Sequence, residues 1–272
     1  MSQVAEDLAG DSPVVWLHDI REGDTIRYRM GRQGGVLVAE WPNVARLTCR
    51  PDGTGARLMP SAGSSVRPMA KLRGVVSVLL GDLRGGLGIH ASAVALGSRA
   101  VVFLGSGDAG KSTAAAELCA RHRARLLADD AALLEERAGV IRVAPTESRH
   151  YLTPASGRAL GIRVRGTRLG PRGKAAILPA RTANRSARIA LVVSLRFDDS
   201  LDGPVCRPLR GSAAALRVVG SLFRFDLGDR HRELDLVTRL YDQGRFVEIA
   251  RPRQRPSIVR LVLEALEGDH GR

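Results

Sequence analysis

The sequence predicts an α/β fold in which a small β-rich N-terminal part precedes a larger core. Three observations predict it. Residues 13–50 alternate short β-like runs with turn residues, which is typical of a small antiparallel sheet. A buried apolar run at 100–104 leads through a glycine-rich loop into an alanine-rich helix at 112–121. A third apolar run, at 124–128, reads as a strand and ends in two aspartates.

The remaining elements follow from apolar periodicity. We expect an N-terminal subdomain over residues 1–70 and a core over residues 71–272. The expected helices of the core are 72–83, 233–241 and 257–266, and the further strands are 89–96, 189–197 and 246–249. Residues 157–186 are rich in Gly, Arg and Pro, so we expect a long loop near the functional site there.

Composition limits the classes of protein. A chain of 272 residues with 44% hydrophobic residues can bury a full core. Its apolar stretches are too short to span a membrane, and its acidic start lacks a signal pattern, so we expect a cytoplasmic protein with no membrane partner. Cys49, Cys119 and Cys206 are widely separated, which indicates neither a disulfide framework nor a zinc site.

The formal charge of +14 comes almost entirely from arginine, since only Lys71, Lys111 and Lys174 are lysine. The arginines are scattered, and aromatic residues make up 4% of the chain, which leaves little to stack on bases. A nucleic-acid partner is therefore disfavoured. We interpret most of this charge as solvated surface residues. Some of it could bind an acidic peptide or protein substrate. The oligomeric state stays open, and a homo-oligomer is allowed.

The glycine-rich loop carries the most specific pattern in the chain. Its residues fit Gly-x-x-x-x-Gly-Lys-Ser/Thr and run Gly105, Ser106, Gly107, Asp108, Ala109, Gly110, Lys111, Ser112, Thr113. Between a strand and a helix, such glycines let successive N–H groups point at phosphate oxygens, and the helix N-terminus adds its positive dipole end. Lys111 would reach the β- and γ-phosphates, and the Ser112 hydroxyl would hold Mg²⁺. The loop thus predicts ATP and Mg²⁺ as cofactors.

Asp129 and Asp130 follow the next apolar strand, 18 residues after Lys111. Ligands of doubly wound sheets bind beyond the carboxyl ends of the strands, where both carboxylates would face the γ-phosphate and its metal. Neighbouring residues on a strand point to opposite faces, so one could accept a proton while the other holds Mg²⁺. The alternative is an aspartate pair that caps a following helix at 131–137. His90, alone in an apolar strand, could reach the same crevice or be a core residue.

These three motifs together resemble the core of the HPr kinase/phosphorylase superfamily. The matching residues are His90 to Val94, Gly105 to Thr113, and Leu127 to Asp130, and the likeness is clear over about residues 87–132. The resemblance implies a phosphoenolpyruvate-carboxykinase-like P-loop core. It also implies Asp129 as proton acceptor, Lys111 on the phosphates, Ser112 as a Mg²⁺ ligand, and His90 as an active-site residue. With Asp129 as the proton acceptor, Asp130 is the carboxylate of the pair that we expect to hold Mg²⁺.

The chain also departs from the family pattern. Residues 160–166 lack the metal-binding glutamate of the family signature, and the long N-terminal domain is missing. The chain thus looks like the short relatives that phosphorylate ribosomally made peptides such as lasso precursors. Glu147 is a candidate replacement ligand, and Arg149 and Lys174 resemble the basic positions that such relatives place around the phosphates.

The prediction is therefore a Mg²⁺-ATP-dependent kinase that transfers the γ-phosphoryl group to a serine hydroxyl of a peptide or protein. Basic stretches at 163–188 and 251–255 are candidates for holding an acidic substrate. Three alternatives share the loop: a kinase of a small hydroxyl compound, a P-loop NTPase switch without an acceptor, and a nucleic-acid-binding NTPase.

Overall fold

The computed structural model describes residues 12–64, 66–162, 174–177, 181–223, 225, 230–253 and 257–268. It divides into two compact units. The first comprises Met1–Gly86 with Arg224–Gly228, and the second comprises Leu87–Phe223 with Asp229–Arg272. The division therefore falls after Gly86, whereas the sequence placed the boundary after residue 70, so the helix expected at 72–83 belongs to the first unit.

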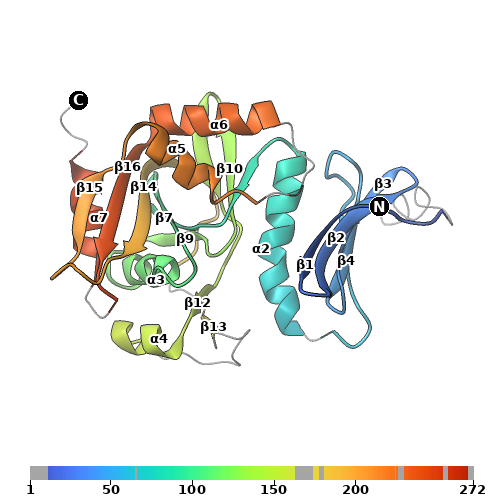
Figure 1. Ribbon diagram of the computed structural model, residues 1–272, viewed down its shortest axis with the longest axis horizontal. Helices are drawn as coiled ribbons and strands as arrows, with labels where there is room; N and C mark the ends of the chain where they lie inside the picture. The colour runs from blue at the N-terminus through green and yellow to red at the C-terminus, as the bar shows by residue number, and fades with distance from the viewer. Residues whose placement is uncertain are drawn as a thin grey trace. The chain divides into compact units, whose positions relative to one another are not determined.

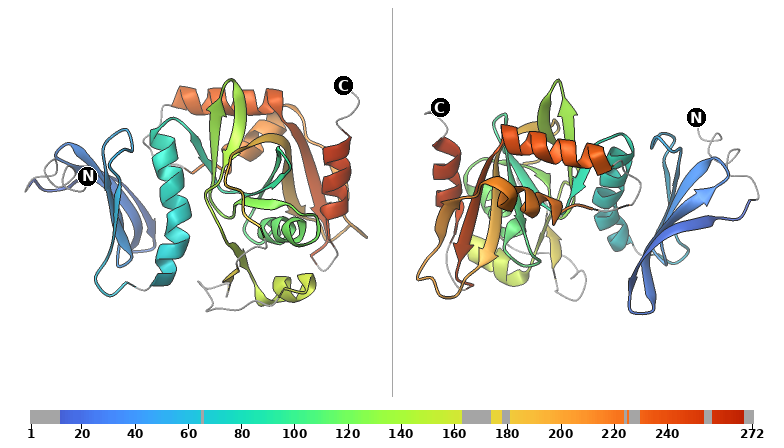
Figure 2. Two further views of the ribbon diagram at one scale, coloured as in Figure 1. Left: turned by 180° about the vertical axis from the view of Figure 1, so that it is seen from behind. Right: turned by 45° about the horizontal axis from the view of Figure 1, so that its top comes forward.

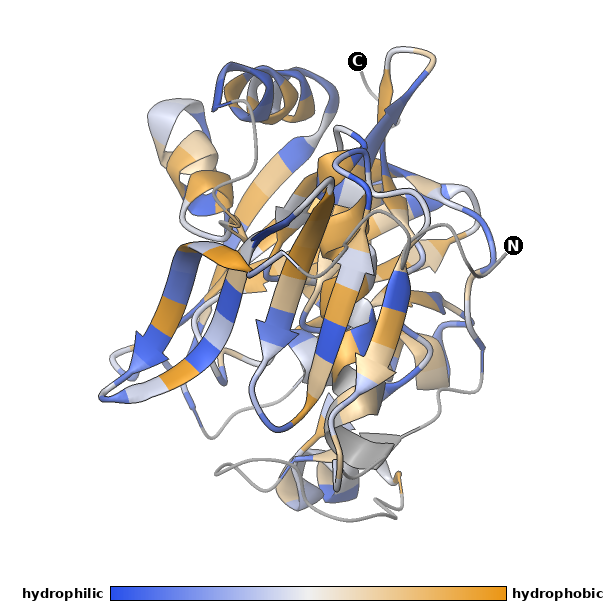
Figure 3. Ribbon diagram, turned by 90° about the vertical axis from the view of Figure 1, so that its right-hand side faces the viewer, coloured by the Kyte–Doolittle hydropathy of each residue, from blue (hydrophilic) through white to orange (hydrophobic). Residues whose placement is uncertain are grey.

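The first unit is a five-stranded antiparallel sheet with one helix. Its strands pair in the order of the chain: β1 (Val15–Glu22), β2 (Thr25–Gln33), β3 (Val36–Trp41), β4 (Ala45–Cys49) and β5 (Arg57–Pro60). Along β4, buried residues alternate with half-buried ones, because successive side chains point to opposite faces of a strand. The alternation of hydrophobic and hydrophilic residues is visible in Figure 3. Helix α2 (Val66–Leu83) completes the unit (Figure 1), and the expected small antiparallel sheet is confirmed.

The second unit is built on a nine-stranded mixed sheet. Three central strands run parallel in the order β8, β14, β16, and the other neighbouring pairs are antiparallel. The strands are β6 (Leu87–Ile89), β7 (Ser92–Leu96), β8 (Arg99–Gly105), β9 (Arg125–Ala128), β10 (Ala132–Arg137), β11 (Val140–Ala144), β14 (Ala187–Phe197), β15 (Val205–Pro208) and β16 (Arg245–Arg251). A separate ribbon pairs β12 (His150–Leu152) with β13 (Ala175–Ile177).

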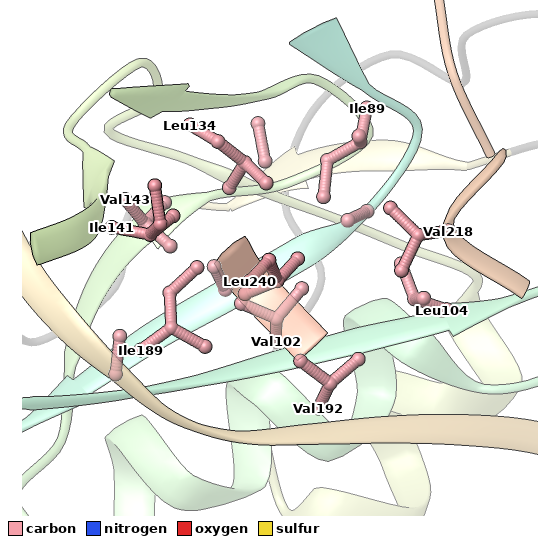
Figure 4. Packing of buried hydrophobic residues seen from close by; sticks show 14 of the residues in the cluster. Ile89, Val102, Leu104, Leu134, Ile141, Val143, Ile189, Val192, Val218 and Leu240 are labelled. Atoms are coloured by element: carbon pink, nitrogen blue, oxygen red, sulfur yellow. The ribbon is translucent and has the colours of Figure 1, made fainter. Parts of the chain in front are cut away.

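Helices cover both faces of this sheet (Figure 1, Figure 2). Alternate residues of β8 belong to different cores, since side chains alternate along a strand. Val102 and Leu104 pack in the core shared with α5 (Gly211–Val219) and α6 (Arg230–Gln243), which Figure 4 shows. Val101 and Phe103 pack in the core shared with α3 (Lys111–Arg121) and α7 (Val259–Glu267). The architecture of this unit is therefore α/β, and the short α4 (Pro154–Leu160) follows β12.

The pairing brings the ends of several strands to one edge of the sheet. Strands β8, β14 and β16 are parallel, so their last residues, Gly105, Phe197 and Arg251, meet there. Strand β9 is antiparallel to β7, which is antiparallel to β8, so β9 also ends at this edge, just before Asp129. Strand β7 begins at the same edge with Ser92. Sites in such sheets form beyond the carboxyl ends of the strands.

The structure corrects three details of the sequence prediction. Residues 132–137 form β10 and not the helix that an aspartate-pair cap would begin. The strand expected at 89–96 is two strands, because β6 pairs with β10 while β7 pairs with β8 and β9. The loop expected at 157–186 contains part of α4 and β13, while residues 163–173 and 178–180 lie outside the described part of the chain. Within that part, no helix is long and apolar enough to cross a bilayer.

Candidate active site

The loop between β8 and α3 needs glycine at two positions. Gly105 has φ +140°, and a Cβ there would lie 2.5 Å from the carbonyl oxygen of Leu195 on β14. Gly110 has φ +99°, and a Cβ there would collide with the guanidinium of Arg251 on β16. L-residues rarely adopt such backbone angles. At Gly105 the backbone of β14 also leaves no room for a side chain, whereas at Gly110 the flexible end of the Arg251 side chain can move aside. The packing against β14 thus fixes the first glycine of the motif, and the backbone angle fixes the last.

Lys111 lies inside the loop. Its side chain is buried, and its Nζ donates hydrogen bonds to the carbonyl oxygens of Gly105 at 2.8 Å and Ser106 at 3.1 Å. Burial lowers the pKa of the Lys111 ammonium and the nearby charge of Lys174 adds to this, while the carboxylates of Asp130 and Asp129 oppose it. Partial desolvation of a cation that still carries its charge strengthens its attraction for an anion placed in the loop.

Asp129 occupies the centre of a buried hydrogen-bond network. None of its surface is exposed. Its Oδ1 accepts from the Ser92 hydroxyl at 2.6 Å, and its Oδ2 accepts from the backbone N–H of Tyr151 at 2.8 Å. Nδ1 of the buried His150 lies 3.7 Å from Oδ2, beyond a hydrogen bond but close enough for attraction when the imidazole is protonated. Burial alone would raise the pKa of Asp129, but His150 and the two donors outweigh it and lower the pKa.

Asp130 has a different environment from its neighbour. It is partly exposed and has φ +75°, a left-handed conformation that few non-glycine residues adopt. Its carbonyl oxygen accepts a hydrogen bond from Nδ1 of His90 at 2.9 Å, and its carboxylate raises the pKa of Lys111. His90 lies at the break between β6 and β7, where its backbone N–H donates a hydrogen bond to the carbonyl oxygen of Ser221 at 2.6 Å. The structure thus joins the His90 segment to the aspartate pair.

The geometry separates the two aspartates where the sequence placed both in the crevice. Asp129 faces inward and has both oxygens hydrogen-bonded, so in this conformation no bound hydroxyl can reach it. Asp130 is the partly exposed carboxylate of the pair. The catalytic role of Asp129 stays a prediction.

Sequence reasoning missed the residues that surround Asp129. Ser92, His150 and Tyr151 are 37, 21 and 22 positions away in the chain and meet Asp129 only through the tertiary fold. Their one sequence signal is polar character in short apolar runs. Glu147 is half-buried close by, and burial together with the charge of Asp129 raises its pKa to about 7.

The basic residues predicted around the phosphates are placed in part. Lys174 is half-buried, and its charge acts on Lys111. Arg149 is exposed, and its charge lowers the pKa of Glu147. Most of the basic stretch at 163–188 and the end of the stretch at 251–255 lie outside the described residues.

The oxygen donors at this edge fit a magnesium ion that arrives with phosphate. Among the described residues there is no cluster of three or more His, Cys, Asp or Glu side chains that could hold a metal alone. Ser112 in the first turn of α3 and the partly exposed Asp130 supply a hydroxyl and a carboxylate beside the loop. Mg²⁺ is typically bound by one or two such groups plus substrate phosphates and waters. The donor set therefore suits Mg²⁺ carried by a nucleotide.

Comparisons with known proteins give a likeness of structure and none of sequence family. No protein-family model matches the chain, and no curated protein matches it. Among solved structures, the chain is similar to the HPr(Ser) kinase/phosphatase from Coxiella burnetii, with 13% sequence identity and a TM-score of 0.35. The match covers 67% of this chain and 89% of that one.

Proposed function

We propose that this protein is a Mg²⁺-ATP-dependent kinase with a phosphoenolpyruvate-carboxykinase-like core, and that it phosphorylates a serine hydroxyl of a peptide or protein. One observation carries the proposal. The glycine loop with its buried Lys111 lies at the same edge of the sheet as Asp129 and Asp130, and the charges of both aspartates act on Lys111. A phosphate cradle beside carboxylates is what transfer to a hydroxyl requires, because the phosphates need cations and the hydroxyl needs a proton acceptor.

In the proposed reaction the serine oxygen bonds to the γ-phosphorus, the bond from that phosphorus to the ADP oxygen breaks, and a carboxylate takes the hydroxyl proton. Loop N–H groups and Lys111 bind the phosphoryl oxygens. Mg²⁺, when bound with ATP, neutralises charge on the phosphates, and Ser112 and Asp130 are the groups that would hold it. Two assignments of the carboxylates are possible. Family resemblance assigns the proton to Asp129 and leaves Asp130 to Mg²⁺, whereas exposure favours Asp130 as the proton acceptor, in which case Ser112 would hold Mg²⁺ together with the phosphates.

The site also supports a role for His90. Its imidazole lies against the Asp130 carbonyl and is itself exposed, so it is placed to fix the Asp130 backbone or to meet the substrate. A peptide acceptor is preferred to a small hydroxyl compound because Lys174 and Arg149 add positive charge around the site, which suits acidic residues flanking a serine.

Intact-mass detection of phosphoryl transfer tests the proposal. Mg²⁺-ATP is incubated with serine peptides carrying acidic, neutral or basic flanks, and with free serine and polyols. We compare the wild type with Asp129→Asn, Asp130→Asn and Asp242→Asn, an exposed aspartate on α6 that serves as the control. A gain of one phosphoryl group on a peptide, retained by the control and lost in at least one of the other two variants, supports the kinase. ATP turnover without transfer would instead indicate an NTPase switch, and transfer to a polyol alone a small-molecule kinase.

A further inference from the structure

A cavity of about 570 Å³ adjoins the loop on the side away from the aspartate pair. It lies between α3, α4 and the ends of β14 and β16, and its lining includes Asp108 and Gly110 of the loop and Thr113 of α3. The far wall is formed by Phe197, Arg251 and Arg253. Its volume lies within the range of small-molecule sites in proteins. The cavity is therefore continuous with the phosphate loop and large enough for more than a phosphate.

Phe197 and Arg253 lie against each other on this wall, and we call this pair the platform. The Phe197 ring is half-buried at the end of β14, and the guanidinium carbon of Arg253 lies 4.6 Å from the ring centroid. Asp199 steadies Arg253, since its Oδ1 accepts from the Arg253 backbone N–H at 2.9 Å. Aromatic rings and guanidinium planes are the two side-chain surfaces on which nucleobases stack. A structural explanation exists too, because a cation over a ring stabilises a surface without any ligand.

Arg251 links this platform to the phosphate loop and favours the ligand explanation. Its guanidinium donates to the carbonyl of Ala109 at 3.3 Å and lies 5.5 Å from the Phe197 centroid. Its Nε is buried and has no hydrogen-bond partner among the described residues. That atom has no accessible surface and does not face the cavity, but the rest of the guanidinium lines it. Its charge therefore lies where a phosphate held by the loop would leave toward the cavity, which favours a ligand that spans both.

Polar groups line the floor of the same cavity. The buried carboxylate of Glu117 on α3 is held by Arg121 at 2.9 Å, and the Thr113 and Ser156 hydroxyls are 3.2 Å apart between α3 and α4. Carboxylate and hydroxyl oxygens can accept hydrogen bonds from sugar hydroxyls or from an exocyclic amine. The carboxylate would repel a phosphate, and the neutral hydroxyls would not offset its charge. The wall and floor of the cavity thus suit a nucleoside, and the loop suits its phosphates.

We propose that this cavity binds the base and ribose of a nucleoside triphosphate, with the base stacked on the platform of Phe197 and Arg253. The inference rests on the proposed function, since it requires that the loop holds the phosphates. It adds the direction of the nucleotide. The base lies on the side of β14 and β16, and the γ-phosphate lies toward the aspartate pair on the side of β9.

Calorimetric titration with two ligands tests the platform separately from the loop. Mg²⁺-ATP carries base, ribose and phosphates, whereas magnesium tripolyphosphate carries phosphates alone. The wild type should bind ATP more tightly than tripolyphosphate. Phe197→Leu, which keeps apolar bulk but loses the aromatic face, should weaken ATP by about 5- to 150-fold, the range set by base–aromatic stacking of roughly 1–3 kcal/mol. Its affinity for tripolyphosphate should stay unchanged.

Two further variants complete the design. Arg253→Ala should weaken ATP selectively, while Arg260→Ala, an exposed arginine on α7, should weaken neither ligand. Lys111→Ala should weaken both. Unchanged ATP affinity in Phe197→Leu, or equal loss of both ligands, would overturn the platform while leaving the loop intact. A wild type that binds tripolyphosphate as tightly as ATP would do the same. Binding of neither ligand by the wild type would refute the proposed function itself.

Discussion

Replacement of Asp129 distinguishes a carboxylate that holds the site together from one that transfers protons. In Asp129→Ala the Ser92 hydroxyl and the Tyr151 N–H lose their acceptor inside the protein. A buried donor without a partner costs roughly 1–3 kcal/mol. The hydroxyl can rotate toward another acceptor and then loses only part of its hydrogen-bond energy, but the backbone N–H stays unpaired, so we expect a total loss of about 2–4 kcal/mol. For a domain of this size that corresponds to a drop in Tm of about 4–16 °C.

Asp129→Asn should cost less. Its amide oxygen can still accept from the Tyr151 N–H, and its amide nitrogen can donate to the Ser92 oxygen. The charge, its attraction to His150 and the acceptor of the Ser92 O–H are lost, but that hydroxyl can rotate toward another acceptor. We expect a loss of about 1–2 kcal/mol. The pKa of Asp129 is lowered in the folded protein, so its contribution is present above the ordinary carboxyl pKa and is lost as the pH falls through the folded value. The Asn variant should therefore show a smaller loss of stability on acidification.

Urea unfolding followed by circular dichroism measures both variants, with Asp242→Ala as the exposed control. An Asp129→Ala protein within about 0.5 kcal/mol of the wild type, the usual range for surface substitutions, would refute the buried network. If Asp129→Asn is folded and transfers phosphate normally while Asp130→Asn does not, Asp129 is a positioning residue. Loss of transfer in a well-folded Asp129→Asn protein, with ATP binding retained, would restore Asp129 as the proton acceptor.

Two further predictions concern the surroundings of the loop. Burial and Asp129 raise the pKa of Glu147 to about 7, so stability should fall as the pH rises from about 4.5 to 7 and then level off. Glu147→Gln should remove this fall and, at pH 8, be more stable than the wild type by about 1 kcal/mol, a value reduced for the partial exposure of the side chain. Thermal melts of both proteins across pH test this, and identical pH profiles would contradict it. Gly110→Ala should lose about 1–2 kcal/mol from its left-handed backbone, since the Arg251 side chain can move aside, and its ATP affinity should fall. An Ala variant with unchanged melting and ATP affinity would show that this backbone is not needed.

The elements that sequence predicted well are those whose signal is local. Residues 100–121 carry an apolar run, a glycine loop and a helix-forming stretch, and β8 and α3 appear there. The region around β10 shows why other elements were missed. Its sequence, Ala-Leu-Leu-Glu-Glu-Arg, favours a helix, but pairing with β6 and β11 makes it a strand. Ala138 and Gly139, both with positive φ, form the turn to β11 and were the overlooked hairpin signal.

The same distinction between local and long-range signals applies to the residues of the candidate site. The loop and the aspartate pair were found because each is a short pattern at the end of an apolar strand. The partners of Asp129 were not, because contacts across 21 to 37 residues depend on β7, β9 and β12 meeting in space. Phe197 and Arg251 were not singled out as a pair either. They are neighbours only because β14 and β16 are parallel and in register, with Phe197 opposite Arg251.

The order of strands at the edge gives the site a direction. Loop strand β8 has β7 and β9 on one side and β14 and β16 on the other. The carboxylates and His90 lie on the first side, and the platform of Phe197 and Arg253 lies on the second. A nucleotide threaded through the loop with its base on the platform would present its γ-phosphate to the carboxylates. An acceptor hydroxyl would then have to enter beside β9 and β12, next to Lys174 and Arg149. Charge reversal there should therefore raise the KM for an acidic peptide by a larger factor than the Kd for ATP, whereas substitutions at the platform should raise the Kd for ATP by the larger factor.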